Sequence, residues 1–201
     1  MSVLWQGDKR WRSELVGEGP GRIGKIGCVV TSFANLLRFW HLDDNATPVS
    51  VMTNAKAWAK METERSGKKA RAFIGDLVVW ANVGAGNGLV VEDVVDERNG
   101  QARMREVIRE ALEADDPRAC FLWVDKDSPA TPDEDDRGKH WVAATFLLKG
   151  DKDDDDEVHY LDSATADEGA INLRTLSGVS MWGSEVKLYR VRAVRVVRPQ
   201  P

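Results

Sequence analysis

Apolar residues recur at helical spacing in three stretches of the first half of the chain. The first stretch covers residues 28–40, where an apolar side chain returns every three or four positions. The second follows Pro48, a residue favoured in the first turn of a helix, and Thr47 stands where a cap is needed. The third covers residues 103–114 and stops before Pro117. The pattern predicts three amphipathic helices.

The second half of the chain changes to the alternating pattern of β-strands. Strand-like runs occupy residues 119–124, 140–148, 157–162 and 185–198. Helices followed by strands are typical of an α+β fold with an antiparallel sheet. We expect a single domain over residues 1–201, with an N-terminal arm, a mainly helical lobe and a mainly β lobe over residues 1–24, 25–118 and 119–201.

The segments between these elements are acidic or rich in glycine. Residues 125–136 and 151–157 carry many carboxylates, which repel one another and resist burial, so we expect solvated loops there. The glycine-rich residues 84–88 suggest a phosphate-binding loop, but the Lys-Ser/Thr pair of such a loop does not follow them. A structural turn is the simpler prediction.

Composition excludes several classes of protein. A chain of 201 residues with 42% hydrophobic residues can bury a substantial core. The net charge of -5 argues against a nucleic-acid partner, which needs a basic face. No apolar stretch approaches the roughly 20 residues of a membrane span, and the N-terminus is charged where a signal peptide is apolar. We expect a cytoplasmic protein without a membrane span, with delivery by a phage or a secretion system left open.

The chain has two cysteines and three histidines. Their scattered positions show none of the close spacings of zinc sites, so we predict no metal ligands. Cys120 lies in an apolar strand and is expected to be a small buried residue. Cys28 differs, because it begins a predicted helix, where the helix dipole and unpaired N–H groups favour the thiolate. Cys28 is therefore the candidate nucleophile.

A nucleophilic cysteine needs a base and a group that orients the base. His41 ends the helix that Cys28 begins and lies too far along it, whereas His159 alternates with apolar neighbours like a solvent-side strand residue. His140 opens one predicted strand and Asp162 ends the next. If these strands form a hairpin, the start of one faces the end of the other. The pattern therefore predicts a triad of Cys28, His140 and Asp162.

Attack on a carbonyl group also creates negative charge on its oxygen, and hydrogen-bond donors must be in place to receive that charge. The backbone N–H of Cys28 can supply one donor. The side-chain amide of Gln6 is a candidate for the second, although the local sequence is equally consistent with an ordinary polar residue in the N-terminal arm.

The order of these motifs points to a known family. Gln6 beside a tryptophan, residues 23–28 ending in Gly-Cys, the triplet His140-Trp141-Val142 and the segment 160–165 follow one another along the chain. This layout resembles the papain-like cysteine peptidases related to the double-glycine bacteriocin-leader peptidases. The resemblance implies a papain-like α+β fold, in which a helical lobe packs on an antiparallel sheet and the active site lies in the cleft between them.

The same resemblance implies roles for individual residues. Cys28 would be the nucleophile, His140 the general base and acid, Asp162 the orienting carboxylate and Gln6 a donor of the oxyanion hole. The family often has a proline after the aspartate, where this chain has Ser163, so the local turn is left open.

These residues predict a cysteine peptidase or amidase. It would cleave a peptide or related amide bond in a peptide or protein substrate through an acyl-enzyme intermediate, without a cofactor. A transpeptidase or peptidoglycan amidase would use the same residues. The alternative from another class is a non-catalytic adaptor of the same fold that binds a basic partner through its acidic loops.

Overall fold

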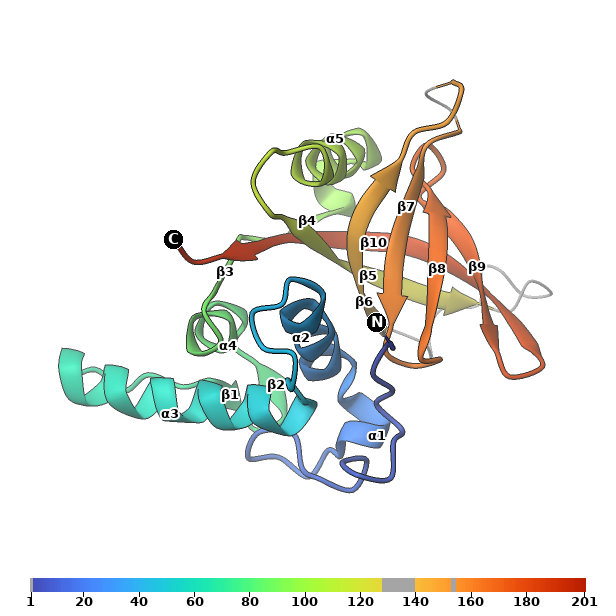
Figure 1. Cartoon of the computed structure of the whole chain (residues 1–201). Helices are drawn as coiled ribbons and strands as arrows, with labels where there is room; N and C mark the ends of the chain where they lie inside the picture. Colours follow the sequence, from blue (N-terminus) through green and yellow to red (C-terminus); the bar gives the residue numbers. More distant parts are fainter. Residues whose placement is uncertain (1, 128–139, 153–154) are drawn as a thin grey trace.

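The computed structural model describes residues 2–127, 140–152 and 155–201 (Figure 1). Its helices are α1 (Ile23–Ile26), α2 (Cys28–Phe39), α3 (Pro48–Ser66), α4 (Trp80–Gly86) and α5 (Gln101–Leu112), with a short 3-10 helix at Glu97–Asn99. Its strands are β1 (Phe73–Ile74), β2 (Leu77–Val78), β3 (Leu89–Val91), β4 (Val95–Asp96), β5 (Ala119–Asp127), β6 (His140–Leu148), β7 (Glu157–Asp162), β8 (Asp167–Asn172), β9 (Ser177–Trp182) and β10 (Glu185–Pro199).

In the described part of the chain, six antiparallel strands close into a barrel. The strands follow the order β5, β6, β7, β8, β9 and β10, and β10 pairs with both β9 and β5. This double pairing is available because β10 is long: its first residues pair with β9, and residues 188–197 pair with β5. Strands β3 and β4 pair with the far part of β10 and lie outside the barrel.

The predicted papain-like α+β fold, with a cleft between two lobes, is therefore wrong. The structure is mostly β, with a closed barrel, two extra strands on β10 and only a few helices among the described residues. The error arises from β8 and β9, to which the apolar pattern assigned no strand. Segment 167–172 contains two acidic residues and a glycine, and segment 177–182 contains two serines and a glycine. These two strands convert an open sheet into a barrel.

The strands that the pattern did predict are present, and their alternation creates two separate cores. Side chains that point into the barrel, such as Leu122 and Tyr160, pack with Met104 and Ile108 of α5. Side chains on the outer wall, such as Phe121, pack with α2, α3 and α4. Figure 1 shows α2 beside the barrel wall, α4 beside β3 and α5 near the end where β7 begins. Helix α5 therefore covers one end of the barrel, and the opposite end holds the starts of β6 and β10.

The predicted helices are confirmed, with small differences at their ends. Helix α3 begins with the expected cap: the Thr47 hydroxyl oxygen accepts from the Ser50 N–H, and the Ser50 hydroxyl oxygen accepts from the Thr47 N–H. The glycine-rich segment 84–88 is only partly a turn, because Gly86 lies in α4 and packs directly against the Ala55 backbone of α3. A β-carbon at Gly86 would lie 2.6 Å from the Cα of Ala55.

The acidic segment 151–157 differs from the predicted solvated loop. Asp156 is 1% exposed, and its carboxylate accepts a hydrogen bond from Arg109 of α5 at 2.9 Å. The backbone N–H of Gly150 also donates to this carboxylate. A buried carboxylate is tolerated where charged and polar donors surround it. Residues 128–136 of the other acidic segment, and residues 153 and 154, lie outside the described residues.

Where the chain is described, no helix combines the length and the apolar character that crossing a lipid bilayer requires.

Candidate active site

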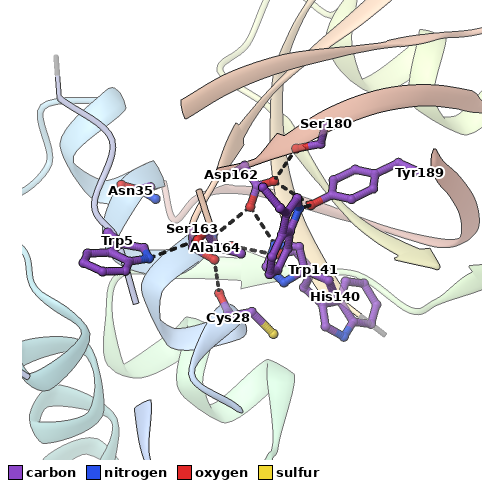
Figure 2. A network of polar contacts seen from close by, with 12 residues as sticks. Trp5, Cys28, Asn35, His140, Trp141, Asp162, Ser163, Ala164, Ser180 and Tyr189 are labelled. Atoms are coloured by element: carbon purple, nitrogen blue, oxygen red, sulfur yellow. Dashed lines mark hydrogen bonds and ion pairs between the residues drawn. The ribbon is translucent and has the colours of Figure 1, made fainter. Parts of the chain in front are cut away.

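Elements far apart in the chain bring the predicted triad to one end of the barrel (Figure 2). Cys28 is the first residue of α2, His140 is the first residue of β6 and Asp162 is the last residue of β7. Strands β6 and β7 are antiparallel neighbours, so the start of one lies beside the end of the other. The predicted closeness of His140 and Asp162 across the β6–β7 pair is confirmed.

His140 and Asp162 occupy inward-facing positions of their strands and are almost completely buried. The Nε2 atom of His140 lies 2.7 Å from Oδ1 of Asp162, and the two side chains are 3% and 1% exposed. Because Nε2 is engaged by the carboxylate, Nδ1 is the ring nitrogen left for another partner.

The carboxylate of Asp162 is surrounded by hydrogen-bond donors. The backbone N–H of Ala164 donates to Oδ1 at 2.8 Å, and the hydroxyl of Tyr189 donates to Oδ2 at 2.7 Å. The Ser180 hydroxyl approaches Oδ2 at 3.3 Å. Burial raises the pKa of Asp162, but the bond and charge of His140 and the bonds from Tyr189 and Ala164 hold it below its ordinary value. Asp162 is therefore ionised at neutral pH.

The environment of His140 favours its protonated form. Burial lowers the pKa of the imidazole, but its hydrogen bonds to Asp162 and Cys28 and the charges of both residues raise it to about 9. At neutral pH, His140 is an imidazolium whose charge is balanced by two acidic neighbours.

Cys28 is partly exposed, unlike the other two members of the triad. Burial of the sulfur raises the pKa of this thiol. The hydrogen bond and charge of His140 lower it, as do the backbone N–H groups of Trp141 and Val29, and the net pKa falls below its ordinary value. Val29 belongs to the first turn of α2, where N–H groups lack an acceptor within the helix. The directions of these pKa shifts at Cys28 and His140 therefore favour a thiolate–imidazolium pair.

Hydrogen bonds between elements fix the position of Cys28 against the barrel. The Ser32 hydroxyl of α2 donates to the carbonyl oxygen of Trp141 at 3.1 Å. The Ser163 hydroxyl, just after β7, donates to the carbonyl oxygen of Cys28 at 3.4 Å. The Trp141 ring lies on the outer face of β6, where its centroid is 4.6 Å from the ring centroid of Trp80. Helix α2 is thus attached to both strands that carry the other triad residues.

Gln6 lies in an N-terminal arm that is held at the same junction. Its backbone N–H donates to the carbonyl oxygen of Ser163 at 2.8 Å, and the Trp5 indole N–H donates to the carbonyl oxygen of Ala164 at 3.0 Å. Nearer the N-terminus, the backbone N–H of Leu4 donates to the side-chain oxygen of Asn35 in α2. The Gln6 Oε1 atom is buried without a hydrogen-bond partner among the described residues. Its role as an oxyanion-hole donor stays a prediction.

Two residues of this site were missed by the sequence analysis: Tyr189 and Ser180. Tyr189 alternates with other inward-facing residues of β10, so the strand pattern could have placed it inside the sheet. Ser180 and Trp182 lie in β9, for which no strand was predicted. The closure of the barrel between β9 and β10 brings Ser180 to Asp162 and Trp182 to Tyr189.

Other hollows and titratable groups of the protein lie away from the triad. A hollow of about 510 Å³ between α3 and residues 69–73 and one of about 350 Å³ on α5 contain no triad residue in their linings. Cys120 is buried in β5, where burial raises the pKa of its thiol far above the usual range. In the described ranges, no group of three or more His, Cys, Asp or Glu residues is arranged to hold a metal ion.

The fold and the site together define a β-barrel protein with a Cys-His-Asp constellation at one end of the barrel. No protein-family model matches the chain, and no curated protein matches it significantly. The function must therefore be inferred from the chemistry of the site.

Proposed function

We propose that this protein is a cysteine hydrolase that cleaves a peptide or related amide bond through an acyl-enzyme intermediate. One observation carries the proposal: His140 contacts the buried carboxylate of Asp162 through one ring nitrogen and interacts with the thiol of Cys28, a residue that is partly exposed. A low thiol pKa at an accessible cysteine is typical of a nucleophile, whereas a structural cysteine is buried and inert.

In the first half of the proposed reaction, the Cys28 thiolate attacks the carbonyl carbon of the substrate. A C–S bond forms, and the π electrons of the carbonyl move to its oxygen. The backbone N–H of Cys28, with the Gln6 amide as the proposed second donor, stabilises that oxyanion. As the C–N bond breaks, Nδ1 of His140 gives its proton to the leaving amine, and a thioester remains on Cys28.

In the second half, the neutral imidazole of His140 removes a proton from water. The resulting hydroxide attacks the thioester, the C–S bond breaks and the carboxylic acid leaves. Cys28 returns as a thiolate and His140 as an imidazolium, so the starting pair is restored. Asp162 remains ionised throughout and orients the ring, as the carboxylate does in other triads.

The reactivity of Cys28 tests this proposal. We expect iodoacetamide to label Cys28 rapidly near pH 7, and the substitution His140→Ala to slow labelling at least about tenfold because the pKa of the thiol returns toward its ordinary value. Mass spectrometry of the labelled peptides measures both rates, with buried Cys120 as the internal reference. Slow labelling in both proteins would contradict the proposal and favour the non-catalytic adaptor.

A further inference from the structure

A second layer of hydrogen bonds lies behind the triad, on the two strands that close the barrel. The Tyr189 hydroxyl of β10 donates to Oδ2 of Asp162 at 2.7 Å. The Trp182 indole N–H of β9 donates to the same Tyr189 oxygen at 2.9 Å. The Ser180 hydroxyl, also on β9, is the longer contact to Oδ2 at 3.3 Å. Figure 2 shows Tyr189 and Ser180 converging on the carboxylate from the side opposite Cys28.

We propose that Tyr189 is a positioning residue of the triad, which together with Trp182 keeps the Asp162 carboxylate ionised and turned toward His140. This inference rests on the proposed function and adds a part of its machinery that the triad alone does not contain.

The need for such a residue follows from where Asp162 lies. Its side chain is 1% exposed, and the interior of the barrel around it is built largely from apolar side chains. An ionised carboxylate in such surroundings is costly unless donors satisfy both oxygens. His140 and Ala164 serve Oδ1, whereas Tyr189 and Ser180 serve Oδ2. Without the Tyr189 hydroxyl, Oδ2 keeps only the weaker contact to Ser180.

Trp182 determines the direction of the Tyr189 hydroxyl. A phenol has one proton to donate, and an indole N–H can only donate. Because the Trp182 N–H points at the Tyr189 oxygen, the phenolic proton is directed to Asp162. A donor that itself accepts a hydrogen bond becomes a stronger donor, so the two contacts reinforce each other.

The titratable groups around Asp162 determine how the reactivity of Cys28 changes with pH. His140 faces it from β6, Tyr160 lies on β7, Tyr189 faces it from β10, and Cys28 on α2 contacts His140. Burial and the charge of Asp162 raise the pKa of both tyrosines above the usual range, so both stay neutral in any working buffer. A change of Cys28 reactivity with pH therefore reports the triad.

The substitution Tyr189→Phe tests the inference, because it keeps the ring and removes only the hydroxyl. Loss of the donor raises the pKa of Asp162, weakens its support of the imidazolium and makes the Cys28 thiolate form at higher pH. We expect the pH midpoint of iodoacetamide labelling to rise by about one to two units, the range that a hydrogen bond to a charged group is worth.

Tyr160→Phe is the matched control. Tyr160 is also buried in the barrel, with its ring centroid 5.9 Å from that of Tyr189, but its hydroxyl is not among the donors that serve the Asp162 carboxylate. The substitution Tyr160→Phe also removes a phenolic oxygen from the core of the barrel, so it should leave the pH midpoint of Cys28 labelling unchanged. Circular dichroism establishes that each variant is folded before it is labelled.

Two further variants keep the inference testable if Tyr189→Phe does not fold. Ser180→Ala and Trp182→Phe each remove one donor of the network, and both should raise the midpoint by less than Tyr189→Phe. A folded Tyr189→Phe protein with an unchanged or lower midpoint would overturn the inference, as would unchanged midpoints in both other variants. A wild-type protein whose Cys28 titrates like a free thiol would instead contradict the proposed function.

Discussion

The two cysteines of the chain show how strongly position determines the chemistry of one residue type. Cys120 points into the barrel from β5, and burial raises the pKa of its thiol. Cys28 begins a helix beside an imidazolium, which lowers the pKa of its thiol despite the cost of burial. The predicted positions of the two cysteines, Cys28 at a helix start and Cys120 in a buried strand, are confirmed. Both kinds of position can be recognised from local sequence without knowledge of the fold. The partner of Cys28 required the pairing of β6 with β7 as well.

Gln6 gives a prediction at the scale of a single residue. If its amide donates to the oxyanion, Gln6→Ala should lower kcat about 100-fold or more and leave KM nearly unchanged, since this interaction forms mainly in the transition state. The measurement is steady-state hydrolysis of a fluorogenic peptide amide that the wild-type protein cleaves. Gln101→Ala is the control, because Gln101 is exposed at the start of α5. Equal kcat values for the two variants would show that Gln6 does not donate to the oxyanion.

At the scale of elements, the helices and the longer strands could be predicted because their apolar periodicity is strong. Helices α2, α3 and α5 follow the spacing of their buried faces. Strands β8 and β9 carry no such signal: β8 has one fully buried apolar residue, Ile171, and β9 exposes Val179 and Met181. Their pairing is determined by neighbouring strands, which a local pattern does not contain. This omission also explains why Tyr189 was not linked to Asp162.

The attachment of α5 to the barrel gives a prediction for one element. Asp156 is buried, and its carboxylate accepts hydrogen bonds from Arg109 of α5 and from the Gly150 N–H. Asp156→Asn removes the charge from this contact and should lower the free energy of unfolding by about 1.5–3 kcal/mol. Urea denaturation followed by circular dichroism measures the change. The neighbouring exposed residue supplies the control Asp155→Asn, and an equal effect of both substitutions would show that Asp156 does not anchor α5.

At the scale of the whole molecule, the barrel wall separates two cores and carries the site at one end. The interior core packs with α5, and the outer core packs with the helices that position Cys28. His140 and Asp162 approach from inside the barrel, whereas Cys28 approaches from a helix that packs on its outer wall. The sequence predicted both sets of residues but placed them in a different architecture. The closeness of the three residues depends only on the β6–β7 pair and on α2. They therefore come together although the predicted fold is wrong.

The buried carboxylate makes the stability of the whole barrel depend on pH. The pKa of Asp162 lies below its ordinary value of 3.8, so its contribution to stability is present above pH 3.8 and is lost as the pH falls through the lower, folded value. We therefore expect the difference in free energy of unfolding between the wild-type protein and Asp162→Asn to narrow from pH 6 to pH 2.5. Urea titrations at several pH values measure it. A constant difference would mean that the charge of Asp162 does not stabilise the fold.

The position of Tyr189 in β10 has a consequence for the order in which the site can form. Strand β10 follows all three triad residues in the sequence, and it must pair with both β9 and β5 before the phenol can reach Asp162. A nascent chain that already contains all three triad residues still lacks this support. The hydrogen bond from Tyr189 to Asp162 is therefore present only once β10 has joined the barrel, so a chain with an open barrel carries the three residues without this contact.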